Sequence, residues 1–383
     1  MVDGGAAPRI AMVAGEASGD LLAGLLLAAL RRRWPALVAQ GIGGPQMAAQ
    51  GFDAWWPHER LAVRGYAEVL RHYRGLVALR RELGDRLLAE RPDLFIGVDA
   101  PDFNLGLAER LRAAGLRTVQ FVSPSIWAWR PGRVHQIARA VDAVLCLFPF
   151  EPAIYAAHGV AAHFVGHPLA DEIPLEVPRA AARAALGIAD TDRVVALLPG
   201  SRRSEIAYIA PLLVAAADRM WRERPSLRFV LPAAPGLRAQ IEPLLVRRGV
   251  HAPIALLDGQ AHTALAACDL TLIASGTATL EAALFKRPMV IVYNMHWLSW
   301  HWMKRQKMLP WVGLPNILLR DGVVPELLQG AATPERVAEA GLAWLADEAA
   351  GARLAARFLQ LHLELRRDTA QAATDAIATI LAR

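Results

Sequence analysis

The feature that most constrains the fold of this chain is an alternation of short apolar runs with helical patterns, which occurs twice along the sequence. Uninterrupted apolar runs alternating with helices indicate a parallel β-sheet that is covered on both faces. In the first half, Asp20–Arg33 has a helical pattern, and strands are predicted at Arg9–Ala14, Leu37–Ile42, Leu94–Val98, Arg117–Val122, Val141–Leu147 and Ala162–Val165.

The alternation pauses at Gly166–Arg179, a segment with three prolines and no clear period that we interpret as a linker. It then restarts, with strands predicted at Arg193–Leu198, Leu227–Leu231, Ile254–Leu257, Leu270–Ile273 and Met289–Val292. This pattern predicts an α/β fold class, with two doubly wound Rossmann-like domains facing a cleft at residues 1–168 and 169–332 and a helical tail at residues 333–383. Since ligands bind beyond the carboxyl ends of such strands, we expect the site in that cleft.

Composition narrows the class of protein further. With 54% hydrophobic and 20% charged residues over 383 positions, the chain has the material for sizeable cores and is not disordered. The two cysteines exclude a disulfide framework and a cysteine-rich metal site. The longest apolar run, Leu21–Leu30, is too short to span a membrane, and Met1–Arg9 lacks the pattern of an export signal, so we expect a cytoplasmic protein.

The net charge of +6 suits an anionic partner, either nucleic acid, a nucleotide-linked substrate or an acidic membrane surface. A GC-rich genome that encodes arginine freely would give the same charge, so charge alone does not choose between these partners.

The common cofactor and catalytic motifs are absent from the sequence. It contains neither the glycine pattern of nicotinamide-binding strands, nor a P-loop, a nucleophile elbow or a zinc-protease motif. Asp190–Asp192 precedes a strand instead of following one, which favours a polar turn over a metal site. His296 and His301 are five residues apart and do not share a helix face. We therefore expect no metal and no cofactor.

The first candidate site motif is Gly15–Asp20 (GEASGD), which follows the first predicted strand and opens a helix. Either Ser18 or Asp20 is expected to cap that helix. Glu16 is not needed for a capped turn, and at the loop tip the helix N-terminus would stabilise its charge. We treat Glu16 as a candidate for contact with substrate, with a plain capped turn as the alternative.

A second carboxylate follows the predicted strand at Leu94–Val98. Asp99 lies at the carboxyl end of this strand, where it suits a general base that takes a proton from a hydroxyl nucleophile. A structural or orienting carboxylate is the alternative reading of Asp99. Asp102 is better explained as the cap of a helix at Phe103–Ala114.

Two turns in the second half are suited to an anion. Gly200 and Ser201 follow a strand and precede a helix, so their backbone N–H groups are expected to be free for a diphosphate. Arg202 adds a forked cation, and Ser204 is a candidate helix cap. Ser275–Thr277 (Ser275, Gly276 and Thr277) forms a similar turn, and Glu281, about one turn into the next helix, is placed to accept hydrogen bonds from ribose hydroxyls.

Two segments are candidate membrane or acyl-chain surfaces. Aromatic residues interleaved with cations occur at Trp297, Trp300 and Trp302, and apolar residues flanked by arginines recur at helical spacing at Val69, Leu70, Tyr73, Leu76 and Val77. A packed loop and a helix buried against the core are the respective alternatives.

Taken together, the motifs resemble those of the lipid-A-disaccharide synthase family. The matching blocks are AGEASGD (Ala14–Asp20), GIGGPQM (Gly41–Met47), GVDAPDFN (Gly97–Asn104), SPSIWAWRPGR (Ser123–Arg133), FPFE (Phe148–Glu151), VGHPLAD (Val165–Asp171), LLPGSRRSEI (Leu197–Ile206), SGTATLEAAL (Ser275–Leu284) and GLPNILL (Gly313–Leu319). They extend from Arg9 to about Leu328, whereas Asp53–Tyr66 and the tail after Thr333 match only loosely.

The resemblance implies a GT-B type glycosyltransferase that is inverting and independent of metal. It implies UDP-2,3-diacylglucosamine as donor and 2,3-diacylglucosamine 1-phosphate (lipid X) as acceptor, with a β-1,6-linked disaccharide 1-phosphate and UDP as products. It also implies action at the cytoplasmic face of the inner membrane of a Gram-negative bacterium, and a possible homodimer in which C-terminal segments are exchanged.

Residue by residue, the resemblance supports Asp99 as the base and Glu16 as a carboxylate needed for activity. It places Arg202 near the UDP diphosphate, and it links Glu281 and Asn316 to UDP binding, with Ser275–Thr277 in the same wall. The alternatives are another UDP-sugar enzyme of this architecture, a non-catalytic membrane-peripheral glycolipid binder and, third, a nucleic-acid binder, for which no recognised module is present.

Overall fold

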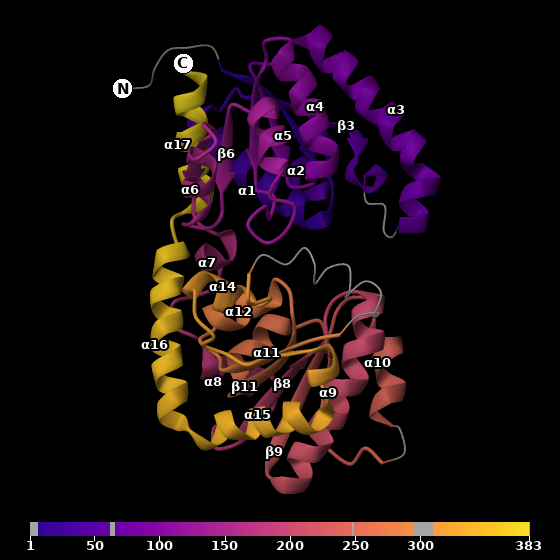
Figure 1. Cartoon of the computed structure of the whole chain (residues 1–383), viewed down its shortest axis with the longest axis vertical. Coiled ribbons are helices and arrows are strands. Elements are labelled where there is room, and N and C mark those ends of the chain that lie inside the picture. Colours follow the sequence, from indigo (N-terminus) through magenta and orange to yellow (C-terminus); the bar gives the residue numbers. More distant parts are fainter. Residues whose placement is uncertain (1–6, 62–65, 247–248, 295–308, 383) are drawn as a thin grey trace. The chain divides into compact units, whose positions relative to one another are not determined.

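The computed structural model describes residues 7–61, 66–246, 249–294 and 309–382, with side chains of the helix at 66–90 described from residue 74. The chain forms two compact units (Figure 1). Unit 1 comprises Met1–Asp171 and Leu365–Arg383, and unit 2 comprises Glu172–Glu364. The crossing into unit 2 falls within the predicted linker, which contains a short helix, α7 (Pro168–Glu172).

Unit 1 is built on a sheet of parallel strands in the order β3-β2-β1-β4-β5-β6-β7. The strands are β1 (Arg9–Ala14), β2 (Val38–Gly43), β3 (Asp53–Pro57), β4 (Leu94–Val98), β5 (Arg117–Phe121), β6 (Ala143–Cys146) and β7 (Ala161–Phe164). The connecting helices are α1 (Ala17–Arg33), α2 (Pro45–Ala48), η1 (His58–Arg60), α3 (Tyr66–Glu90), α4 (Pro101–Ala113), α5 (Arg133–Ala140) and α6 (Glu151–Ala156).

The central strands of this sheet are buried because helices cover both faces. β4 is buried at every position, and its side chains divide between two hydrophobic clusters: Leu94 and Ile96 belong to one, and Phe95 to the other. Strand β3 was not predicted. It lies at the sheet edge and is half-exposed, so it lacks the continuous apolar run by which the central strands were recognised.

Unit 2 repeats this architecture with a parallel sheet in the order β10-β9-β8-β11-β12-β13. Its strands are β8 (Arg193–Leu198), β9 (Leu227–Ala233), β10 (Ile254–Asp258), β11 (Leu270–Ala274), β12 (Met289–Tyr293) and β13 (Glu326–Leu328). Its helices are α8 (Arg179–Ala185), α9 (Arg203–Glu223), α10 (Arg238–Leu245), α11 (Ala261–Ala267), α12 (Ala278–Leu284), α14 (Leu314–Leu319), η2 (Gln329–Ala331), α15 (Pro334–Ala346) and α16 (Glu348–Leu365). The short edge strand β13 was not predicted.

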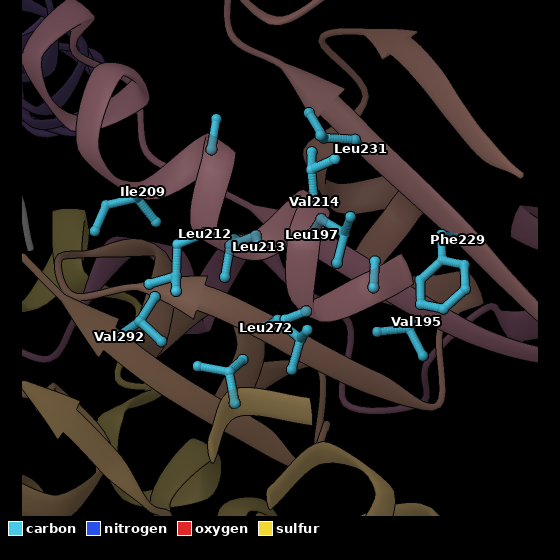
Figure 2. Close-up of a cluster of buried hydrophobic side chains, with 14 of the residues drawn as sticks. Val195, Leu197, Ile209, Leu212, Leu213, Val214, Phe229, Leu231, Leu272 and Val292 are labelled. Atoms are coloured by element: carbon cyan, nitrogen blue, oxygen red, sulfur yellow. The ribbon is translucent and has the colours of Figure 1, made fainter. Parts of the chain in front are cut away.

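The core of unit 2 forms where α9 packs on the sheet (Figure 2). Ile209 and Leu213 of α9 lie in one buried cluster with Leu197 of β8, Phe229 of β9 and Leu272 of β11. This packing holds the carboxyl ends of β8 and β11 in place, and the candidate turns of unit 2 begin there.

The C-terminal tail is divided between the two units. Helices α15 and α16 belong to unit 2, while α17 (Thr369–Leu381) belongs to unit 1, where Ala373 and Ile377 are part of the hydrophobic core. The Asp171 carboxylate accepts hydrogen bonds from the backbone N–H groups of Arg367, Asp368 and Thr369, which anchors the start of α17. Exchange of this segment between two copies stays a prediction.

Candidate active site

In unit 1, the two predicted carboxylates follow neighbouring strands. Strands β1 and β4 are paired in parallel, with Ala14 opposite Val98, and the strand order reverses at this pair. Glu16 follows β1 and Asp99 follows β4, so the fold brings both to the point where doubly wound sheets bind ligands.

The backbone at Asp99 is held in an unusual conformation. Asp99 and Ala100 both have left-handed φ angles, of 50° and 41°, which is a costly arrangement for two successive residues that are not glycine. The side-chain amides of Asn104 and Gln120 donate to the Asp99 carbonyl at 2.9 and 3.0 Å, and the Asp99 N–H donates to the Phe121 carbonyl. Backbone strain that is fixed in this way by its surroundings is typical of active sites.

The electrostatic surroundings of Asp99 suit a base. Burial raises the pKa of the Asp99 carboxyl, and the negative charge of Glu16 raises it further, against a backbone hydrogen bond from Ala100 that lowers it. A carboxylate with a raised pKa accepts a proton more readily than an ordinary aspartate does.

Beside Asp99 lies a cavity of about 230 Å³. Its walls come from the ends of β4 and β5 and from the loop that leads to α5, and they include Asp99, Ser123, Trp129, Arg130 and Arg133. Arg133 forms an ion pair with Asp102. The prediction that Asp102 caps a helix is therefore wrong: α4 begins at Pro101 with Ala100 as N-cap, because the strained turn starts the helix two residues earlier.

A buried carboxylate supports the loop of this cavity from behind. Glu151 accepts hydrogen bonds from the Trp127 indole N–H at 2.9 Å and from the Phe148 N–H at 3.0 Å. Ser123, in the cavity wall, shares a hydrogen bond with the Tyr155 hydroxyl at 2.8 Å. Burial raises the pKa of Glu151 to about 7 despite the hydrogen bonds that favour its charged form.

Asp20, one of the two predicted caps of α1, binds a neighbouring turn instead of capping the helix. Helix α1 begins after Glu16 without a side-chain cap, so neither Ser18 nor Asp20 caps it. The buried Asp20 carboxylate accepts from the N–H groups of Gly44 at 2.8 Å and Gln46 at 2.9 Å, at the start of α2. Asp20 thus fixes the β2–α2 turn to α1, a long-range contact that helical periodicity does not reveal.

In unit 2 the strand order reverses between β8 and β11. β8 and β11 pair with Leu198 opposite Ile273, so the turns that begin at Gly200 and Ser275 leave adjacent strand ends. The exposed Gly276 and Thr277 complete the second turn, and the Ser275 hydroxyl donates to the Val312 carbonyl at 3.2 Å.

The turn at Gly200 already holds an anionic group. The N–H groups of Ser201 and Arg202 donate to one Glu205 carboxylate oxygen at 2.9 and 3.2 Å, and the Arg202 side chain donates to the other at 3.1 Å. The expectation of a free N–H group is therefore wrong for Ser201. The expectation of Ser204 as the cap is also wrong, since Arg202 is the N-cap of α9. The Arg202 side chain remains 78% exposed.

Glu281 and Asn316 both have partners within the protein. A Glu281 carboxylate oxygen lies 2.9 Å from His262 Nε2, and this contact raises the pKa of His262. The Asn316 side chain is fully buried, donates to the Val324 carbonyl and to Glu326, and accepts from the Val324 N–H. Asn316 therefore holds the chain around α14 in place.

Comparison with known proteins identifies the family. The family model described as lipid-A-disaccharide synthetase matches residues 10–380. The chain belongs to the lipid-A-disaccharide synthase family. It is 59% identical over 378 residues to the lipid-A-disaccharide synthase of Albidiferax ferrireducens, and the matched region covers 97% of each of the two chains. It is 54% identical over 375 residues to that of Burkholderia thailandensis, which covers 97% of this chain and 96% of the relative.

Solved structures support the GT-B fold of this synthase family member. A UDP-GlcNAc 2-epimerase from Neisseria meningitidis, bound to UDP-GlcNAc, matches with a TM-score of 0.65 at 11% identity and covers 98% of this chain and all of that chain. MurG from Acinetobacter baumannii matches with a TM-score of 0.60 at 14% identity, over 97% of this chain and 99% of that chain. The predicted fold class and enzyme class, a glycosyltransferase of lipid A biosynthesis, are confirmed.

Part of the predicted membrane surface of this synthase lies outside the described residues. Trp297, Trp300 and Trp302 do so entirely, while Val69, Leu70 and Tyr73 are placed by their backbone in α3 without a description of their side chains. Leu76 is half-buried and Val77 is exposed. Among the described residues, no helix is long and apolar enough to cross a membrane.

Several residues of the candidate site escaped the sequence analysis. Asn104 is part of the GVDAPDFN block and Arg130 and Arg133 are part of the SPSIWAWRPGR block, so their presence in family motifs was a signal that we did not use. His262 and Gln120 lie in no recognised motif, and only the folded chain brings them to Glu281 and Asp99.

Proposed function

We propose that this enzyme transfers the 2,3-diacylglucosamine unit of UDP-2,3-diacylglucosamine to the 6-hydroxyl of 2,3-diacylglucosamine 1-phosphate. The products are the β-1,6-linked disaccharide 1-phosphate and UDP. The observation that carries the proposal is Asp99, a half-buried carboxylate of raised pKa held on a strained backbone beside Glu16, in a chain of the lipid-A-disaccharide synthase family.

In the proposed reaction the acceptor 6-hydroxyl attacks the anomeric carbon of the donor from the face opposite UDP. Asp99 takes the hydroxyl proton as the new C–O bond forms, and the bond to the diphosphate breaks with its electron pair leaving on UDP. A single displacement of this kind inverts the anomeric configuration. Glu16, whose charge helps to raise the pKa of Asp99, would keep that base proton-accepting and orient the acceptor.

We assign donor binding to the turns of unit 2. Negative charge grows on the departing diphosphate, and the exposed Arg202 guanidinium, with the Ser275–Thr277 turn, would stabilise it. The Glu205 carboxylate now occupies the N–H groups of Ser201 and Arg202. Donor binding at that turn would therefore require Glu205 to release them. Glu281, held by His262, is proposed to accept from ribose hydroxyls.

The reaction is proposed to need neither metal nor cofactor. A transfer assay in mixed detergent micelles, with labelled donor and with or without lipid X, tests reaction and metal dependence together. We expect disaccharide 1-phosphate only when lipid X is present, at a rate that EDTA does not change. UDP release without disaccharide would point to a hydrolase or another acceptor, and UDP binding without turnover would favour a glycolipid-binding protein.

Asp99→Asn tests the assignment of the base. We expect turnover to fall at least about 100-fold with UDP binding intact, because a positioned base contributes about that much or more. Asp375→Asn is the matched control and should keep its activity. Asp375 is an exposed carboxylate of α17 that pairs with Arg33 of α1. Near-normal turnover of Asp99→Asn would remove Asp99 from the role of base.

We further propose that the enzyme binds peripherally to the inner face of the inner membrane, since its substrates carry acyl chains. The docking surface would be the apolar positions of α3 between flanking arginines, with the tryptophan segment. Changing Val69, Leu70, Leu76 and Val77 to Ser should move the protein out of the membrane fraction while its far-UV spectrum stays the same. An unchanged membrane fraction would contradict this surface.

A further inference from the structure

The cavity beside Asp99 contains two cations that the proposed reaction does not use. Arg130 and Arg133 line it together with Asp99, and all three come from segments that meet at the ends of β4 and β5. The Arg130 side chain is exposed, and its guanidinium lies 4.4 Å from the centre of the Trp129 indole ring, within the range of a cation–π contact.

Arg133 is the more enclosed of the two. Its side chain is 12% exposed, yet its one ion-pair partner in the described part of the chain, Asp102, is 79% exposed. A guanidinium carries five N–H donors, and an exposed carboxylate compensates a largely buried cation poorly because water screens the pair. The enclosed charge of Arg133 therefore favours an anion in the cavity.

We propose that Arg130 and Arg133 bind the phosphomonoester of the acceptor, the 1-phosphate of 2,3-diacylglucosamine 1-phosphate. This inference rests on the proposed function and adds to it the site that recognises the acceptor. In a pyranose, C1 and the carbon that bears C6 both flank the ring oxygen, so the 1-phosphate and the 6-hydroxyl leave the same edge of the sugar. One cavity that contains both cations and Asp99 can hold the phosphate while the hydroxyl faces the base.

Arginine suits this ligand better than lysine does. Its planar fork forms two parallel hydrogen bonds to phosphate oxygens, and a phosphomonoester carries a charge of about −1.5 to −2 at neutral pH. The phosphate charge would also be neutralised close to Asp99, so that the base does not face an uncompensated anion. The donor diphosphate and anionic lipid headgroups share the same chemistry, and the test below separates them.

The test compares two acceptors, lipid X and the same diacylglucosamine without its phosphate, in neutral detergent micelles. For Arg130→Gln and Arg133→Gln we expect kcat/KM with lipid X to fall about 10-fold to 100-fold each, as for loss of a charge-assisted hydrogen-bonding group. The rate with the unphosphorylated acceptor and the KM for the donor should stay near their wild-type values. Arg133→Lys, which keeps the charge but loses the fork, should fall in between.

Arg139→Gln is the matched control. Arg139 lies on the same helix α5, and its guanidinium pairs with Glu109 at 2.7 Å instead of lining the cavity. It should preserve the wild-type preference for lipid X. Because the preference is a ratio of two rates from one preparation, a variant that folds only in part still reports it.

The other results are equally informative. An equal loss with both acceptors would overturn the phosphate site and leave the proposed function standing. A raised donor KM would assign the two arginines to the diphosphate, and a loss seen only when anionic lipid is added to the micelles would assign them to headgroups, each overturning the inference. If the wild-type enzyme forms no disaccharide from lipid X, it is the proposed function that fails.

Discussion

The buried Glu151 behind the cavity loop should make the stability of unit 1 depend on pH. Its carboxylate accepts hydrogen bonds from the Trp127 indole N–H and the Phe148 N–H, and burial raises its pKa from the ordinary 4.5 to about 7. Each pKa unit corresponds to about 1.4 kcal/mol, so this group alone carries about 3 kcal/mol of pH-dependent free energy.

The sign follows from proton binding. Between pH 4.5 and about 7 the folded chain retains a proton on Glu151 that the unfolded chain has released, so folding is favoured at low pH. This contribution is fully present below pH 4.5 and is lost as pH rises through 7. Glu151→Gln has no proton to lose, and its free energy of unfolding should therefore gain about 3 kcal/mol relative to wild type between pH 4.5 and pH 8.

Urea unfolding at several pH values, followed by tryptophan fluorescence and far-UV circular dichroism, measures this difference. Comparing the variant with wild type at each pH cancels the titration of all other groups. Glu109→Gln, which removes a carboxylate paired with Arg139 at the surface, is the control and should show a difference that changes little with pH. A difference for Glu151→Gln that also stayed constant would refute the reasoning, because Glu151 would then titrate as it does in the unfolded chain.

Two further predictions concern other charged groups. Arg183→Met should destabilise unit 2 by about 3–5 kcal/mol in urea unfolding, because it removes the buried ion-pair partner of Asp269 at 3.0 Å. Arg179 pairs with the same carboxylate but is more exposed, so Arg179→Met should cost clearly less, and equal costs would contradict this account. Glu16→Gln should move the acidic limb of the kcat/KM profile to lower pH, because removal of a negative neighbour lowers the raised pKa of Asp99; an unmoved limb would mean that Asp99 does not set it.

Periodicity in the sequence was sufficient to predict the two sheets and the strand ends that carry the site. Strands such as β1 and β4 are uninterrupted apolar runs because helices cover both their faces, so their residues alone identify them. Asp99 stands directly after such a run and Gly200 stands two residues after another, and parallel strands all present their carboxyl ends at one edge of a sheet. Strands β3 and β13 lack this signal because β3 is half-exposed and begins and ends on Asp53 and Pro57, and β13 is only three residues long.

The pairing of charged and polar side chains was decided only by the tertiary structure. Helix-capping rules predicted local roles for Asp20 and Asp102, yet Asp20 binds N–H groups near Gly44 and Asp102 pairs with Arg133. Glu205 fills a turn that was expected to be free for an anion.

The physical reason is that hydrophobic periodicity is a local property of the chain, repeated in each element, whereas a hydrogen bond or an ion pair depends on which elements become neighbours. A carboxylate takes whatever donors the fold brings within reach. The sequence alone therefore determined the architecture and the place of the candidate site. The packing of strands and helices decided which side chains hold Asp99 in its strained conformation and which cations share its cavity.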